Sequence, residues 1–186
     1  MTLLAALLAL SVSGCGLYLD LDVTLFTRVE LEEALQETVT PEDLPAGGGR
    51  VSVVYKTEID LTEDIGDEVD GGGGELVLEQ LHYRVPENTV TTDMHNVEIV
   101  LADAGADSPV GGESLGFVAI IPARTTVETT PLETDLKGEQ ALEERLKALT
   151  FTVFVLADVD VEPEPAPMPS GEAMIEVDVQ AQVRHN

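Results

Sequence analysis

The residues best suited to chemistry in this sequence are four acidic side chains that could bind a cation. They are Asp64, Asp67, Asp70 and Glu75, and four consecutive glycines lie between the last two. Carboxylates are hard oxygen ligands, and glycines would let backbone carbonyl groups turn toward a Ca²⁺ ion. The acids do not follow the regular spacing of an EF-hand loop. The pattern therefore favours a flexible, solvated acidic loop at residues 63–75, with Ca²⁺ binding there as the alternative.

Histidine and serine side chains offer weaker candidates for metal binding or catalysis. His82 and His95 are expected on neighbouring strands, where they could approach each other, but no HxH or HExxH spacing supports a zinc site. No Gly-x-Ser-x-Gly motif occurs, and the glycines at 71–74 lack the Lys-Ser/Thr of a phosphate-binding loop. The absence of Trp also leaves few platforms for stacking sugars. We therefore expect no catalytic residue, no enzyme activity and no cofactor.

The charge of the chain restricts its partners. There are 36 Asp and Glu residues against 9 Lys and Arg, which gives a formal net charge of −27 at pH 7. Such a surface repels nucleic acid and anionic lipid headgroups, and it attracts cations and basic proteins. The same charge could simply serve solubility or a salty environment. In either case we expect no binding to nucleic acid.

The N-terminal segment is strongly apolar and ends at the only cysteine of the chain. Residues 3–10 are all Leu or Ala. This run is too short to span the roughly 30 Å hydrocarbon core of a bilayer as a helix, but it has the length typical of a signal peptide. Val12-Ser13-Gly14-Cys15 follows. This tetrapeptide resembles the lipobox of bacterial lipoproteins, in which an aliphatic residue, a small residue and Gly precede the Cys.

The resemblance implies how the chain is processed and where it goes. A lipobox is cleaved between Gly14 and Cys15, so residues 1–14 would be a signal peptide and Cys15 the new N-terminus. That cysteine would carry a diacylglycerol and usually a third acyl chain, such as palmitate. Two or more acyl chains anchor a protein stably in a membrane. Gly16, in place of Asp, favours the outer membrane by the sorting rule of enteric bacteria.

Alternating hydrophobicity predicts strands along most of residues 15–186, which we expect to form a single domain. Apolar residues occupy almost every odd position from Leu17 to Leu31, a pattern typical of one or two half-buried strands, although 31–36 could form a short helix. Pro86 is expected to end one of the later strands. The more continuously apolar segment 114–121 is expected to be covered on both faces. The remaining strands are predicted at 51–61, 75–85, 95–101, 125–129, 151–161 and 173–183.

One helix is predicted at 136–149, capped by Thr134 or Asp135. Its apolar stripe would contain Leu136, Ala141, Leu142, Leu146 and Leu149. The proline-rich residues 162–169 are typical of an extended, stiff linker. About seven or eight strands with one crossover helix predict an all-β protein, an antiparallel β-sandwich that is Ig-like in character.

These expectations point to a lipid-anchored protein of the bacterial cell envelope with a non-catalytic structural or protein-docking role. Its partner would be another envelope protein, which could add a strand to an edge of the sandwich. The alternative is a surface protein that binds Ca²⁺ or another ligand through the acidic residues at 63–75.

Overall fold

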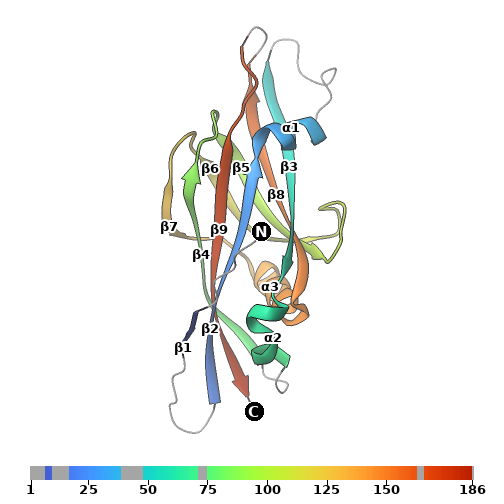
Figure 1. Ribbon diagram of the computed structural model, residues 1–186, viewed down its shortest axis with the longest axis vertical. Coiled ribbons are helices and arrows are strands. Elements are labelled where there is room, and N and C mark those ends of the chain that lie inside the picture. The colour runs from blue at the N-terminus through green and yellow to red at the C-terminus, as the bar shows by residue number, and fades with distance from the viewer. Residues whose placement is uncertain (1–6, 10–16, 39–47, 71–74, 163–165, 186) are drawn as a thin grey trace.

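A computed structural model describes residues 7–9, 17–38, 48–70, 75–162 and 166–185. Two antiparallel sheets pack face to face, which confirms the predicted β-sandwich (Figure 1). The five-stranded sheet has the order β1 (Leu7–Ala9), β2 (Leu17–Glu30), β9 (Glu172–His185), β4 (Glu75–Asn88) and β7 (Val127–Pro131). The four-stranded sheet has the order β3 (Gly49–Asp60), β8 (Thr150–Val161), β5 (Met94–Asp103) and β6 (Glu113–Ile121).

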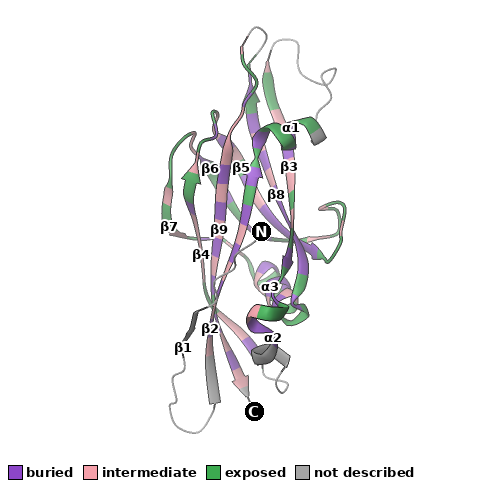
Figure 2. Ribbon diagram, in the orientation of Figure 1, coloured by how far each residue is buried: buried purple, intermediate pink, exposed green. Residues whose placement is uncertain are grey.

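Strand β2 pairs with β9 along its whole length. The register runs from Leu17 opposite His185 to Glu30 opposite Glu172. The alternation that starts at Leu17 therefore belongs to one strand of 14 residues rather than two. From Asp20 to Glu30, buried residues alternate with partly buried or exposed ones (Figure 2). From Leu21 to Val29 the odd positions of β2 thus face the second sheet, and the even positions from Asp20 to Glu30 face outward.

The core between the sheets consists almost entirely of aliphatic side chains. Val53, Ile99, Val155 and Val179 are all at most 2% exposed and belong to one continuous cluster. Burying a side chain of this size contributes roughly 1.5–3 kcal/mol. With a single cysteine in the sequence, no disulfide can form within the chain, so this packing holds the sandwich together.

The prediction that residues 114–121 are covered on both faces was wrong. They form β6, an edge strand, whose outward side chains Phe117 and Ile120 are 43% and 42% exposed. The strand covered on both faces is β8, in which every residue from Phe151 to Val155 is buried. On its outer side Phe154 packs in a small second apolar cluster with partly buried Ala106 from the loop after β5. That loop is what covers the sheet there.

Pro86 does not end its strand. Strand β4 continues through it to Asn88, with a shift of register against β9 between Arg84 and Glu87. A proline lacks the N–H that a regular ladder needs, and a bulge is one of the few places where a strand tolerates it. The bulge therefore explains why the strand extends beyond residue 85.

The predicted helix is present as α3 (Leu136–Ala148). Asp135 caps it, because its side chain accepts hydrogen bonds from the backbone N–H groups of Lys137 and Gly138 at 3.0 and 2.9 Å. Leu142 and Leu146 are fully buried, whereas Leu136 is 67% exposed and does not belong to the buried stripe. Two shorter helices precede it: α1 (Leu31–Thr38), where a short helix at 31–36 was the alternative to a strand, and α2 (Thr62–Asp70), which was not predicted.

A pair of helix glycines tests how closely α3 packs against β6. A Cβ on Gly138 would lie 2.6 Å from the carbonyl oxygen of Ser114, whereas a Cβ on Gly66 of α2 would meet no atom closer than 3.6 Å. Gly138→Ala should therefore lower the free energy of unfolding by about 2 kcal/mol through overpacking. Gly66→Ala should raise it by about 0.5–1 kcal/mol, because alanine favours helix.

Urea unfolding of the two variants beside the parent protein gives both values. A Gly138→Ala variant as stable as the parent protein would contradict the close packing described for α3, and a destabilised Gly66→Ala variant would contradict the space described beside α2.

Candidate functional site

The structure corrects the prediction of a flexible acidic loop at residues 63–75. Residues 62–70 form helix α2, with Asp64 partly buried, and Glu75 begins β4 and is exposed. The side chains of Asp67 and Asp70, and residues 71–74, lie outside the described residues. Within α2 the backbone is already hydrogen-bonded, as in the bond from Ile65 N–H to the Leu61 carbonyl at 3.0 Å. Ca²⁺ binding here stays a prediction, but the loop assumed for it does not exist at 62–70.

Helix α2 forms where an apolar residue just before it can be buried together with one inside it. Leu61 and Ile65, four positions apart, are both 0% exposed. Just before the helix, Asp60 accepts a hydrogen bond from the Thr62 N–H at 3.0 Å. The side chain and the backbone N–H of Thr62 together hold the pKa of Asp60 below its ordinary value. The sequence did not predict this short amphipathic helix because most residues at 62–70 are polar or acidic.

The two histidines considered for zinc do not lie on neighbouring strands. His82 is on β4 of the five-stranded sheet, and His95 is on β5 of the four-stranded sheet. His82 pairs in register with Asp178, and His95 pairs with Asp158. Among the described residues, no group of three His, Cys, Asp or Glu side chains could hold a metal ion.

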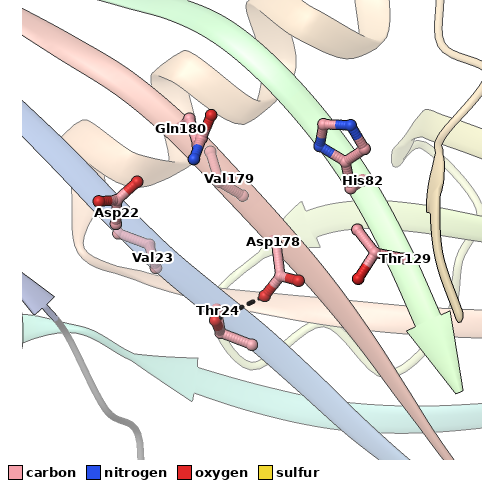
Figure 3. A pocket seen from close by; sticks show the side chains of 8 residues that line it. All are labelled: Asp22, Val23, Thr24, His82, Thr129, Asp178, Val179 and Gln180. Carbon is pink, nitrogen blue, oxygen red and sulfur yellow. Dashed lines mark hydrogen bonds between the residues drawn. The ribbon is translucent and has the colours of Figure 1, made fainter. Parts of the chain in front are cut away.

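The outer face of the five-stranded sheet carries a shallow polar depression of about 370 Å³ (Figure 3). Asp178 lies in its floor and accepts a hydrogen bond from the Thr24 hydroxyl at 2.7 Å. Arg84 Nε lies 3.6 Å from the same carboxylate. The lining presents acceptors from four strands and suits a small cationic or hydrogen-bonding group. It consists of Asp22, Val23, Thr24, His82, Thr129, Asp178, Val179 and Gln180.

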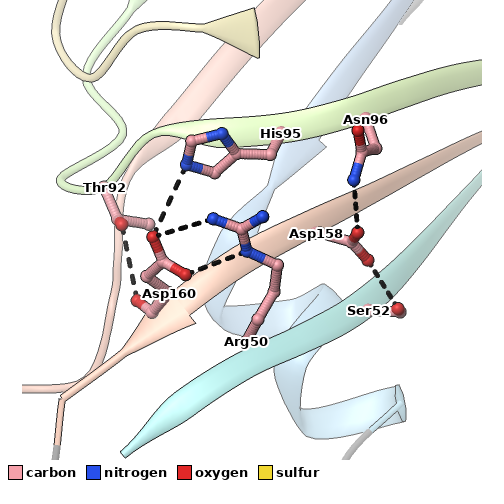
Figure 4. Close-up of polar contacts among 7 residues, drawn as sticks. All are labelled: Arg50, Ser52, Thr92, His95, Asn96, Asp158 and Asp160. Carbon is pink, nitrogen blue, oxygen red and sulfur yellow. Dashed lines mark hydrogen bonds and ion pairs between the residues drawn. The ribbon is translucent and has the colours of Figure 1, made fainter. Parts of the chain in front are cut away.

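The outer face of the four-stranded sheet carries a second polar cluster, drawn in Figure 4. Asp160 is bound by Arg50, with Nε at 3.0 Å, and lies 3.5 Å from His95 Nε2. Asp158 accepts hydrogen bonds from Ser52 at 2.6 Å and from Asn96 at 2.9 Å. The cluster joins β3, β8 and β5 across the sheet.

The contacts of this cluster shift the acidity of both carboxyl groups. Hydrogen bonds, first from Ser52 and then from Asn96, hold the pKa of Asp158 below its ordinary value of 3.8. The hydrogen bond from Arg50 has the same effect on the pKa of Asp160. Both groups are therefore ionised at neutral pH and engaged with neighbours within the cluster.

Sequence patterns did not predict either polar cluster. Each cluster brings together outward-facing residues from strands that are distant in sequence, such as Thr24 and Asp178. The available signal was the polar residues at the even positions of β2 and β9, but their contact depends on which strands pair. Local periodicity does not contain that information.

Comparisons with known proteins give no relative. No family model matches the chain, and neither a curated protein nor a solved structure matches it significantly. Among the described residues, none of the helices is both long and apolar enough to cross a bilayer.

Asp158→Asn tests the electrostatic role of the second cluster. A carboxyl group with a lowered pKa in the folded state stabilises the fold above its unfolded pKa, and this stabilisation is lost as the pH falls through the folded value. The substitution should therefore cost up to about 1 kcal/mol at pH 7, the range expected of exposed polar pairs. The difference from the parent protein should shrink below the ordinary pKa of 3.8.

Urea unfolding at pH 7 and pH 3 measures this difference on either side of the pI of about 4.1. Asp107, whose side chain is 99% exposed and lies 3.5 Å from Lys56 Nζ, gives the control Asp107→Asn, which loses one weak exposed pair and should change stability little at either pH. A cost for Asp158→Asn that is the same at both pH values would contradict the assignment.

Proposed function

We propose that this chain is a lipid-anchored lipoprotein of the bacterial cell envelope with a non-catalytic structural or protein-docking role. The anchor would be Cys15, exposed as the new N-terminus when residues 1–14 are removed at the lipobox-like sequence 12–15. Those four residues lie outside the described part of the chain. The observation that carries the proposal is the position of β2, which begins at Leu17.

Cleavage before Cys15 would leave only Gly16 between the anchor and the first strand. From Leu17 onward, β2 pairs without interruption with β9. Figure 1 shows the start of β2 and the C-terminal end of β9 at one end of the molecule, with α1 at the other. A strand of 14 residues at roughly 3.3 Å per residue is about 45 Å long. The sandwich would thus be held rigidly, with its anchored end against the membrane and its far end well above it.

The charge of the domain supports docking to a basic partner. The ion pairs of the described residues engage a minority of the 36 acidic residues, because the chain has only 9 basic ones. An anchored domain with a net charge of −27 is repelled by anionic lipids. It would therefore present its sides to proteins rather than lie flat on the bilayer. Gly16 after the anchor favours the outer membrane.

A Cys15→Ser variant tests the anchor. The parent protein, expressed in a Gram-negative bacterium, should fractionate with the membranes. Its mass should show the loss of residues 1–14 and the addition of acyl chains. The variant cannot be acylated at residue 15 and should keep its full-length mass. A parent protein that keeps residues 1–14, or one that carries no lipid, would contradict the lipoprotein assignment.

Cross-linking in the native cell tests the docking role separately. The parent protein should give a reproducible cross-linked partner that is lost with Cys15→Ser, because the variant lacks the anchor. A lipidated protein that yields no partner would leave the anchor intact and contradict docking.

A further inference from the structure

Strand β1 occupies the outer edge of the five-stranded sheet. It runs antiparallel to β2, with Leu7 opposite Asp22, Leu8 opposite Leu21 and Ala9 opposite Asp20. Residues 7–9 belong to the segment that the proposed function removes as a signal peptide. If that processing occurs, the chain that reaches its destination has lost β1. Removal of β1 then leaves the backbone N–H and C=O groups of this part of β2 without a partner strand.

We propose that the edge of β2 uncovered by processing is the docking site of this protein. Its occupant is an extended segment of another envelope protein, which pairs antiparallel to β2 and carries basic side chains at alternate positions. This inference rests on the proposed function, because only cleavage before Cys15 removes β1. Adding a strand to an open edge satisfies backbone groups that would otherwise face water, and alternate side chains then decide which segment fits.

The basic character of the occupant follows from the side chains beside this edge. Asp20 and Asp22 alternate with Leu21, so both carboxylates project from the outer face while Leu21 packs in the core. The Gln182 amide donates a hydrogen bond to Asp20 at 3.3 Å. Among the described residues, no side-chain hydrogen bond or ion pair involves Asp22. Directly opposed unlike charges stabilise a strand pair, and like charges destabilise it.

The position opposite Leu21 calls for an apolar residue in the occupant. Leu21 is 1% exposed with β1 in place. Loss of β1 would leave Leu21 at the edge of the sheet, with no strand beside it. An apolar side chain there would close the row that Leu21 shares with Ala181 and Leu78. The segment that fits is therefore one in which basic and apolar residues alternate.

The other edges of the sandwich suit this occupant less well. Strand β3 is the other long edge strand, but Arg50 and Lys56 on its outer face already pair with Asp160 and Glu58, so this edge offers less negative charge to a basic segment. Strand β7 has only five residues and ends at Pro131, which cannot donate a ladder hydrogen bond. The edge of β6 is already engaged by a hydrogen bond from Phe117 N–H to the Glu133 carbonyl at 3.1 Å.

A second copy of this chain is a poor occupant of the same edge. Two copies anchored in one leaflet would both run β2 away from the membrane, so their edges would meet in parallel. The pairing with β1 is antiparallel. Self-pairing would also bring the carboxylates of two chains, each with a net charge of −27, onto one sheet.

Peptide binding to the purified full protein tests the proposal. The probe is a synthetic peptide in which Lys and Val alternate, followed by fluorescence anisotropy in a non-ionic detergent. We expect saturable binding to the processed, lipidated protein. Binding should be about tenfold weaker for a peptide in which Glu and Val alternate, because two cross-strand pairs become repulsive. A peptide of the same Lys and Val content in block order should bind no better than the Glu peptide.

Two variants locate the site. Reversing both charges beside the edge, with Asp20→Lys and Asp22→Lys, should exchange the preference so that the Glu peptide binds better. The matched control, Glu32→Lys and Glu33→Lys, makes the same change of net charge at exposed positions of α1 and should keep the preference for Lys. The uncleaved Cys15→Ser protein retains β1 opposite Asp20, Leu21 and Asp22 and should lose the preference for the Lys peptide.

Equal binding of the alternating and block Lys peptides would overturn the proposal, since it would reflect charge without strand pairing. A stable dimer of the processed protein that is lost with Asp20→Lys and Asp22→Lys would overturn it in favour of a second copy. The mass of the purified parent protein distinguishes failure of the proposed function from failure of the docking site. A mass that retains residues 1–14 overturns the proposed function, and the docking site with it, before any peptide is added.

Discussion

The antiparallel pairing of β2 with β9 is the contact on which the rest of this fold depends. It joins two strands that are far apart in the sequence, with Leu17 opposite His185 and Glu30 opposite Glu172. Strand β9 also pairs with β4, so the centre of the five-stranded sheet is the last strand of the sequence. The five-stranded sheet cannot form completely until β9 is available. Most of its strand contacts therefore join residues that are distant in the sequence, and folds of this kind form slowly. Because β2 would follow the anchor directly, the same pairing would fix the orientation of the whole sandwich relative to the membrane.

A large negative charge is the second constraint. The few basic residues are used to join strands, as Arg28 joins β2 to Glu172 of β9 at 3.0 Å and Arg84 of β4 contacts Glu176 and Asp178 of β9. On the other sheet Arg50 and Asp160 join β3 to β8. These exposed pairs contribute little individually, so the aliphatic core supplies the stability. By pairing with some of the carboxylates, the basic residues reduce the electrostatic repulsion among the acidic residues of the surface.

Much of the fold could be predicted from the sequence because its strands alternate so regularly. The strands that became β2, β8 and β9 and the helix capped by Asp135 were all recognisable from local patterns. Helix α2 was missed because the buried apolar residues Leu61, just before it, and Ile65, within it, stand in a charged segment. The separation of His82 from His95 and the polar clusters could not be predicted, since strand order is set by packing between distant segments. The anchor at Cys15 was predicted from a motif alone, and it stays a prediction.

Hydrogen exchange along β2 is the most direct test of an anchored sandwich with an edge opened by processing. The amides of Asp20, Leu21 and Asp22 are compared between the purified lipidated protein and the uncleaved Cys15→Ser protein in the same detergent. Exchange should be faster at one or more of these amides after processing and unchanged at Val23–Glu30, because β1 pairs only with Asp20, Leu21 and Asp22. Equal protection in both forms, with the loss of residues 1–14 verified by mass, would contradict the opening of this edge.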